Sequence, residues 1–159
     1  MISLSNPTSN LLNMIDTRTS TELTNTQWLQ RLPQNVLVKV NDLTRNEDYP
    51  LEDIREFVEA YGYKNLTNGN YEIWAELTED YDNEAVEAFV EDNGIECIDN
   101  FEDAYCGQFG DIREVVEILL EIHEVEVPNF VVIDYEATWN ANLRHDYIFE
   151  GGFLFNRNF

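Results

Sequence analysis

The sequence predicts an α+β fold: small lobes in which acidic amphipathic helices pack on short antiparallel strands, with an elongated form overall. Three observations lead to this prediction. Apolar residues recur at helical spacing in several segments. Short segments rich in valine and aromatic residues have the composition of strands. Glycine, proline and asparagine separate these segments at positions typical of turns and helix ends.

The length of 159 residues allows one sizeable core or two or three small lobes. We expect a flexible N-terminal arm over 1–26, an acidic α+β lobe over 27–97 and a C-terminal domain over 98–159. The arm is rich in Ser, Thr and Asn, and such a composition offers little apolar surface for a core.

The acidic lobe is predicted to begin with one or two helical turns over residues 27–32, which Pro33 ends. Residues 36–40, VLVKV, have the composition of a short strand. Residues 71–77, YEIWAEL, alternate between apolar and polar side chains, as a half-buried strand does.

Between these two strands the pattern predicts a helix that begins at Pro50, ends at Tyr61 and is capped by Gly62. Its apolar residues fall on one face and its acidic residues on the other. The predicted inward set is Leu51, Ile54, Phe57, Val58 and Tyr61, and the outward set is Glu52, Asp53, Glu56 and Glu59.

A second helix is predicted to begin after Asp82 or Asn83 and to end at Asn93 and Gly94. Its outward glutamates recur at i, i+3 and i+7, at Glu84, Glu87 and Glu91. One helical turn is then expected over residues 101–105, before two glycines interrupt the chain.

The strongest helical pattern lies at residues 112–124. Asp111 can cap its N-terminus, and Glu114 completes a capping-box spacing. Four glutamates recur at i, i+3, i+7 and i+10 on one outward face, at Glu114, Glu117, Glu121 and Glu124. The rise of about 1.5 Å per residue places one negative charge roughly every 5 Å. One DNA strand carries one charge per ~3.4 Å of its axis.

The C-terminal region is predicted to hold a last helix, capped by Asp134 and running to about Arg144. Residues 147–149 and 153–155 resemble strands, and Gly151 with Gly152 joins them in a terminal hairpin.

Charge is unusually negative and unevenly distributed. The chain has 32 acidic and 9 basic residues, a net charge of −23. Residues 1–45 hold three acids and four bases, so the remaining residues carry 29 acids against five bases. Such self-repulsion destabilises a compact state, which indicates a functional use. It argues against direct binding to nucleic acid or to an anionic membrane and favours basic partner surfaces, including DNA-binding grooves.

The other signals are negative. Cys97 and Cys106 lack a CxxC spacing, so we expect reduced thiols and a cytoplasmic location. No apolar run approaches the ~20 residues of a membrane helix, and no signal peptide is evident.

His123 and His145 do not form a zinc motif. Asp134 and Glu136 suit a helix N-terminus better than an acid–base pair. We therefore expect no cofactor, no metal and no enzymatic activity.

From Phe101 onward the sequence resembles the ArdA-type antirestriction proteins of phages and mobile elements. The resemblance lies in FEDAYCGQF at 101–109, the acidic helix after it, VIDYEATWNANLRHDY at 132–147 and the closing GGFLFNRNF. The motif residues, which we expect to serve packing, are Phe101, Ala104, Tyr105, Gly107, Phe109, Asp134, Tyr135 and Trp139.

The resemblance implies a DNA mimic that forms a homodimer and inhibits type I restriction–modification enzymes by occupying their DNA-binding groove. The carboxylates expected to imitate phosphates are Glu52, Asp53, Glu56, Glu59, Glu79, Asp80, Asp82, Glu84, Glu87, Glu91, Asp92, Glu102, Asp103, Glu114, Glu117, Glu121 and Glu124. An alternative with the same electrostatics is an acidic adaptor that masks another basic DNA-binding protein or defence nuclease. An enzyme that uses paired carboxylates or a metal is the third class.

Overall fold

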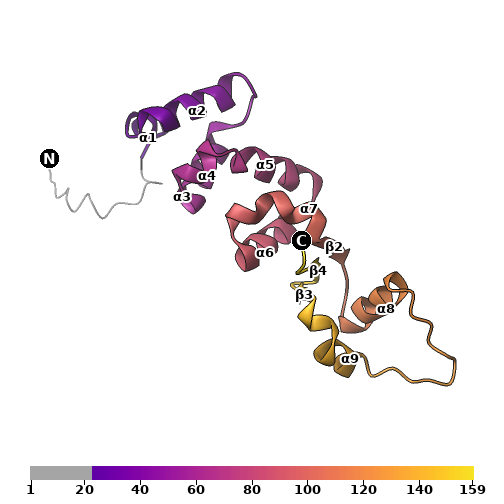
Figure 1. Cartoon of the computed structure of the whole chain (residues 1–159). Coiled ribbons are helices and arrows are strands. Elements are labelled where there is room, and N and C mark those ends of the chain that lie inside the picture. Colours follow the sequence, from indigo (N-terminus) through magenta and orange to yellow (C-terminus); the bar gives the residue numbers. More distant parts are fainter. Residues whose placement is uncertain (1–22) are drawn as a thin grey trace, which may run out of the picture. The chain divides into compact units, whose positions relative to one another are not determined.

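The computed structural model describes residues 23–159, so most of the predicted N-terminal arm lies outside the described residues. The chain divides into two compact units, residues 1–71 and 72–159, which are described separately (Figure 1). Helices and a small antiparallel sheet confirm the α+β class. The division differs from the expected boundary between residues 97 and 98, because the helix at residues 83–93 packs on the C-terminal sheet.

The described part of the first unit is helical. Its elements are α1 (Asn25–Gln30), α2 (Gln34–Arg45), α3 (Leu51–Tyr61) and α4 (Tyr63–Thr67). Helix α5 (Asn70–Asp80) begins in this unit and continues into the second. Helices α2, α3 and α4 contact one another around a core that includes Val40, Ile54 and Leu66.

The strand predicted at residues 36–40 is wrong, since these residues lie in α2. Val36, Val40 and Leu43 are all buried, and they recur at the i, i+4, i+7 spacing of one helix face. Val38 points outward and is exposed. Burial of this face against α3 and α4 outweighs the weak strand preference of valine.

The strand predicted at residues 71–77 is also wrong, since the segment lies in α5. Tyr71 and Leu77 are buried and Trp74 is half-buried, so every third residue marks the inner side of the helix. A seven-residue segment of this kind satisfies the strand and the helix pattern equally well, and local sequence alone does not separate them.

Helix α3 confirms the prediction for residues 50–61. Ile54, Phe57 and Val58 are buried, as expected for the inward face. Pro50, predicted as the first residue of the helix, occupies the N-cap, so the helix begins one residue later, at Leu51. Gly62 has φ +90° and its N–H donates to the carbonyl of Val58 at 2.8 Å, which closes the helix.

The second unit contains the remaining elements. They are α6 (Asn83–Asn93), the 3₁₀ helix η3 (Ile95–Asn100), α7 (Phe101–Ala104), β2 (Tyr105–Gln108), α8 (Ile112–Ile122), α9 (Tyr135–Ala141), the 3₁₀ helix η4 (Leu143–His145), β3 (Tyr147–Glu150) and β4 (Phe153–Asn156). The predicted helix at 83–93 and the turn at 101–105 are confirmed by α6 and α7. The last helix is shorter than predicted, because α9 ends at Ala141 and η4 follows.

The three strands form an antiparallel sheet in the order β2-β4-β3. The terminal hairpin is confirmed: Gly151 and Gly152 both have positive φ, as a two-residue type I′ turn requires. Strand β2 was not predicted. Its four residues include a glycine, and a register shift interrupts its pairing between Tyr105 and Gly107. This segment forms a strand only because it pairs with β4, which lies far away in the sequence.

Alternate side chains of β4 face opposite sides of the sheet. Phe155 contacts Phe89 of α6 and Phe101 of α7, at ring-centroid distances of 5.7 and 6.0 Å. Leu154 packs on the other side with Val115 and Leu119 of α8. The sheet of this unit therefore lies between α6 with α7 and α8 with α9, which explains why all of Phe153–Phe155 is buried.

Candidate acidic interaction surface

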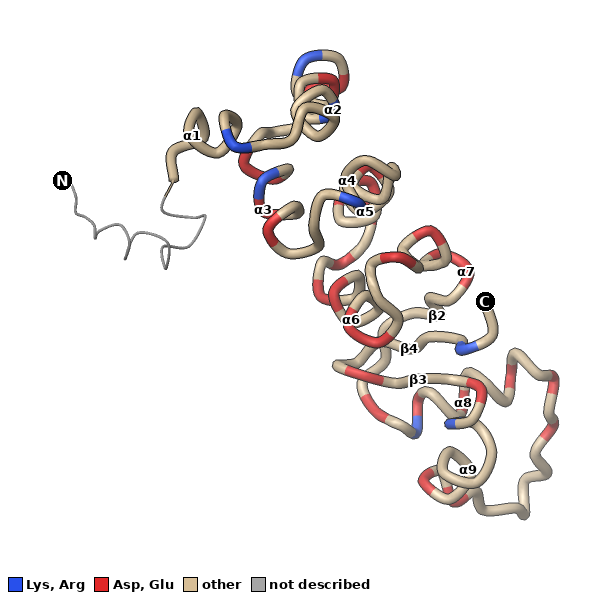
Figure 2. Tube along the Cα trace, turned by 60° about the vertical axis from the view of Figure 1, so that its left-hand side comes forward, with Lys and Arg blue, Asp and Glu red and all other residues tan. Residues whose placement is uncertain are grey.

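The seventeen predicted carboxylates are all exposed. Figure 2 shows Asp and Glu positions recurring along α3, α6, α7 and α8, whereas Lys and Arg positions are sparse. The structure places them in groups: one on α3 in the first unit, and others at the end of α5 (Glu79 and Asp80), on α6, on α7 and on α8 in the second. Glu124 lies just after α8.

On α3, Glu59 differs from its neighbours because it has a buried partner. The Arg55 guanidinium lies 3.3 Å from the Glu59 carboxylate. Arg55 is only 8% exposed, donates to the Asn25 side chain at 3.0 Å and lies over the Trp28 ring. Glu59 thus serves the fold as well as the surface, whereas Glu52, Asp53 and Glu56 face solvent.

The N-terminus of α6 uses Asp82 as its cap. The Asp82 side chain accepts a hydrogen bond of 2.9 Å from the Glu84 N–H. Near the other end of α6, Asp92 lies beside Glu150, a residue that the sequence did not single out. The hydrogen bond and the negative charge of Asp92 raise the pKa of Glu150, and Glu91 adds to the effect.

The segment η3–α7 carries an acidic row of which only the second half was predicted. Glu96 and Asp99 are exposed like Glu102 and Asp103, and they continue the row toward the N-terminus. A 3₁₀ helix aligns residues three apart, so the spacing itself was the missed signal. Glu102 accepts a hydrogen bond of 2.9 Å from the Tyr81 hydroxyl, and this bond raises the pKa of Tyr81.

Asp111 caps the N-terminus of α8 as predicted, but the Glu114 side chain bonds to a different backbone N–H than a standard capping box has. The Asp111 side chain accepts from the Glu114 N–H at 3.0 Å. The Glu114 carboxylate accepts from Gly110 at 2.6 Å, rather than from the N-cap residue as a standard capping box requires. Glu114 therefore secures the loop before α8 and is a structural residue in addition to an exposed one.

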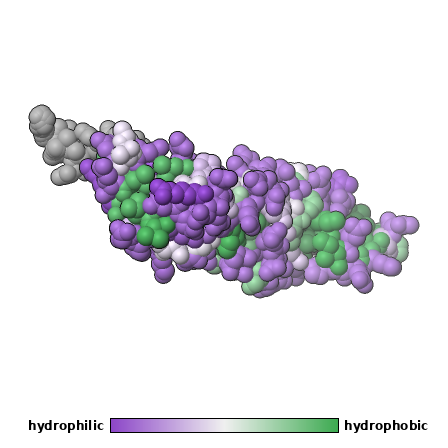
Figure 3. Space-filling view, turned by 90° about the horizontal axis from the view of Figure 1, so that it is seen from above, coloured by the Kyte–Doolittle hydropathy of each residue, from purple (hydrophilic) through white to green (hydrophobic). Residues whose placement is uncertain are grey.

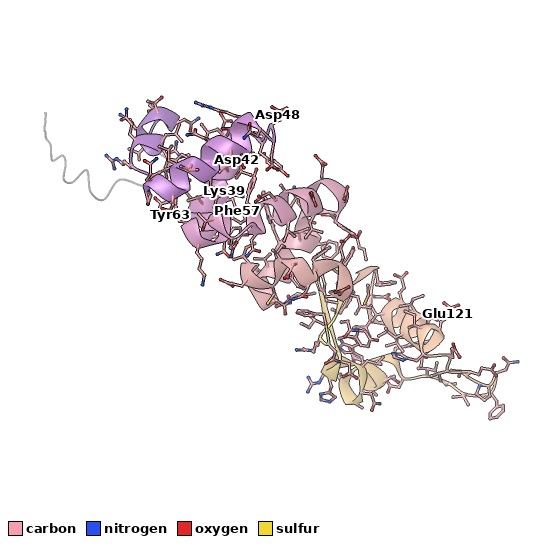
Figure 4. All side chains as sticks on the ribbon, turned by 45° about the horizontal axis from the view of Figure 1, so that its top comes forward. Lys39, Asp42, Asp48, Phe57, Tyr63 and Glu121 are labelled. Atoms are coloured by element: carbon pink, nitrogen blue, oxygen red, sulfur yellow. The ribbon has the colours of Figure 1, made fainter. Side chains whose placement is uncertain are left out.

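The other glutamates of α8 differ in their contacts. Glu117 lies 3.6 Å from Arg113 and accepts a hydrogen bond of 3.3 Å from the Tyr135 hydroxyl of α9. Glu121 is exposed, and Figure 4 labels it on α8.

Glu124 does not belong to the helical stripe, which corrects the predicted four-residue face. Helix α8 ends at Ile122, and Glu124 has φ +58°. Its N–H donates to the Glu121 carbonyl at 3.0 Å, and the Val125 N–H donates to the Leu120 carbonyl at 2.8 Å. These bonds form a Schellman motif, in which glycine usually takes the left-handed position.

The motif residues of the C-terminal region serve packing, as predicted. Phe101 and Ala104 are buried, and Tyr105 stacks on Phe101 at 5.1 Å. Gly107 has φ +125° beside the strand irregularity. Phe109 donates its N–H to the Gly152 carbonyl at 2.8 Å, which ties the segment to the hairpin turn.

At the start of α9, Asp134 acts as the predicted cap and accepts from the Ala137 N–H at 3.0 Å. This role accounts for Asp134 without an acid–base partnership with Glu136. Tyr135 and Trp139 are half-buried. Trp139 packs against the cluster of α8 and sheet residues.

The histidine and cysteine side chains do not form a metal or redox site in the described residues. His123 Nε2 lies 3.1 Å from the Tyr147 hydroxyl, which joins the end of α8 to β3. Within residues 23–159, no group of three or more His, Cys, Asp or Glu side chains is placed to hold a metal ion. Cys97 and Cys106 are free thiols, and burial raises the pKa of Cys106.

Comparison with known proteins gives no match to a family model, a curated protein or a solved structure. None of the helices in the described residues has the length and apolar composition needed to cross a membrane. The arrangement itself offers many solvent-facing carboxylates on rigid helices. These carboxylates can bind a complementary cationic surface through charge-assisted hydrogen bonds.

Proposed function

We propose that this protein is a DNA-mimicking inhibitor, of the antirestriction kind that its C-terminal motifs resemble. Its carboxylates occupy the DNA-binding groove of a type I restriction–modification enzyme and keep DNA out. The observation that carries the proposal is the exposure of all seventeen predicted carboxylates, in a chain with a net charge of −23.

Two features support a role in binding rather than in folding. Within residues 23–159, ion-pair contacts with arginine account for only Glu59 and Glu117 of the seventeen. Hydrogen bonds within the chain engage four more, at Asp82, Asp92, Glu102 and Glu114. All seventeen nevertheless stay exposed, so they can meet a cationic partner. The acidic groups on α6 and α8 also lie on helices that start with side-chain caps at Asp82 and Asp111, so their spacing along these two helices is fixed.

The electrostatics predict how the complex behaves. Many exposed charges facing a basic groove accelerate association and give an affinity that falls steeply with salt. No single carboxylate dominates, because each contact is weak and solvated. The proposal includes a homodimer in the bacterial cytoplasm, since such a dimer would double the length of DNA that the carboxylates imitate.

The direct test uses a purified type I enzyme, its DNA substrate and increasing amounts of the protein. We expect near-stoichiometric relief of both cleavage and methylation, with the enzyme–DNA complex lost at low salt. If DNA and protein bind the enzyme together at low salt, the proposal is wrong. Size-exclusion chromatography with light scattering measures the dimer separately.

An acidic adaptor that masks another basic protein is the second candidate. It is favoured by an apolar segment after α8 that is exposed next to the acidic residues, a feature with no counterpart on the DNA backbone. Affinity capture from host lysate, washed with rising salt, separates the two candidates by the identity of the protein retained.

A further inference from the structure

The segment after α8 exposes a concentration of apolar side chains. Within residues 23–159, six of the nine exposed large apolar residues fall between positions 122 and 132. Phe130 and Val132 are 88% and 94% exposed. Figure 3 shows apolar residues in green toward the right of the view, among the hydrophilic surface around this part of the chain. Exposed apolar patches of this kind mark interaction sites.

This segment borders an open groove of about 620 Å³ that lies entirely in the second unit. Most of the apolar part of the lining comes from α8 and from the loop that follows: Ile118, Leu120, Val125, Val127 and Ile133. The aromatic rings of Phe109 and Tyr135 complete it. The acidic part comes from α8: Glu114, Glu117 and Glu121. The groove thus combines an apolar surface with a row of three carboxylates.

The charges around the groove select its occupant. Arg113 is the cation of α8, and it is already engaged with Glu117 and with the Tyr135 ring at 5.5 Å. Glu124, Glu126 and Asp134 add negative charge along the flanking loop. A second copy placed symmetrically on this surface would bring like charges together, which is unfavourable. A cationic segment with apolar side chains complements both parts of the lining.

We propose that this groove binds a basic amphipathic polypeptide segment of the target protein. Apolar side chains of that segment pack between α8 and the loop at Val125–Val127, and its Lys or Arg side chains meet Glu114 and Glu121. This inference rests on the proposed function, because the groove adds a protein-specific apolar contact to an otherwise electrostatic complex. Such a desolvated contact contributes more to affinity than exposed charge pairs do.

The test uses a fluorescent helical peptide with Leu at i, i+3, i+4 and i+7 and Lys at the intervening positions, and a matched peptide in which Ser replaces Leu at unchanged charge. Anisotropy titrations at low and high salt measure both affinities. We expect the Leu peptide to bind at least about tenfold more tightly, a difference of about 1.4 kcal/mol. We also expect this preference to persist at high salt, because apolar contacts are not screened.

Variants locate the binding. Val125→Ser with Val127→Ser should abolish the preference for the Leu peptide, whereas Val38→Ser, at an exposed valine of α2, should leave it unchanged. Glu121→Gln should weaken both peptides at low salt only. Methyl NMR shifts of wild-type protein should concentrate at Ile118, Leu120 and Val127.

Three outcomes would overturn the proposal. The two peptides could bind equally, the double valine variant could keep the preference, or the methyl shifts could fall outside the groove. A wild-type dimer that the double variant converts to a monomer would show that a second copy fills the groove instead. Because no restriction enzyme is used, failure here is distinct from failure of the inhibition assay, which tests the DNA mimicry itself.

Discussion

The N–H of Val125 donates a hydrogen bond of 2.8 Å to the carbonyl of Leu120, and this bond closes the C-terminus of α8. The bond requires Glu124 to adopt φ +58°. A residue with a Cβ is strained in this conformation, and the negative charge of Glu124 also lies at the negative end of the helix dipole.

Replacing Glu124 by Gly should therefore stabilise the protein by up to about 1 kcal/mol. Urea unfolding followed by circular dichroism measures the change. Glu124→Gln separates the two causes, because it removes the charge and keeps the strained backbone. Glu126→Gly, at an exposed loop position where no positive φ occurs, should give no gain. Equal or lower stability of Glu124→Gly would contradict the account.

The carboxyl group of Glu150 predicts a specific pH dependence. Asp92 raises the pKa of Glu150 in the folded state, so the folded protein binds this proton more tightly than the unfolded chain. The charged form is therefore destabilising at neutral pH. This loss is recovered as the pH falls through the raised pKa toward the ordinary glutamate value of about 4.3.

Glu150→Gln should be more stable than the wild type at pH 7, and the difference should disappear below about pH 4. Urea midpoints across this pH range provide the measurement. Glu126→Gln serves as the control for loss of one exposed negative charge. A gain for Glu150→Gln that is the same at every pH would show that Asp92 is not responsible.

The two arginine–glutamate pairs at i, i+4 spacing should differ in their effect on stability. Arg55→Ala leaves the buried site against Trp28 unfilled and removes the bonds to Asn25 and Glu59. We expect a loss of about 1.5–3 kcal/mol. Arg113→Ala, at a side chain that is 67% exposed, should change stability by less than about 1 kcal/mol. Similar losses at both sites would contradict this distinction.

The glutamates of α8, together with Glu124 just after the helix, should act collectively. Glu121→Gln alone should scarcely change inhibition of a type I enzyme, because each exposed contact is weak. Simultaneous replacement of Glu114, Glu117, Glu121 and Glu124 by Gln should weaken inhibition strongly and reduce its dependence on salt. Gln retains an acceptor for the Gly110 N–H, so the N-terminus of α8 should stay closed. Full inhibition by the quadruple variant, with unchanged thermal unfolding, would exclude this helix from the interface.

Local chemistry explains which parts of the fold were predictable. Caps act within a few residues, so Asp82, Asp111, Asp134, Gly62 and Gly94 marked helix ends correctly. The exposure of the acidic residues followed from the same helical periodicity. Residues 36–40 and 71–77 were assigned wrongly because their short apolar patterns fit both structures, and packing against distant helices decided between them.

The candidate site was predictable to the same extent. The charges were evident from composition, and the acidic faces of α3, α6 and α8 followed from spacing. The pairing of Asp92 with Glu150 depends on the hairpin that places β3 near α6, so no local pattern reveals it. The groove beside α8 likewise depends on how residues 125–133 return toward the helix.

The central position of β4 has a consequence for biosynthesis. Strand β4 follows every other element of the second unit in the chain, yet it pairs with both β2 and β3. The ribosome therefore releases β2, α8 and α9 before the strand that completes their core is made. The local contacts among α2, α3 and α4 are available much earlier. We expect the first unit to fold during translation and the second to wait for Phe153–Asn156, with non-local pairing as its slow step.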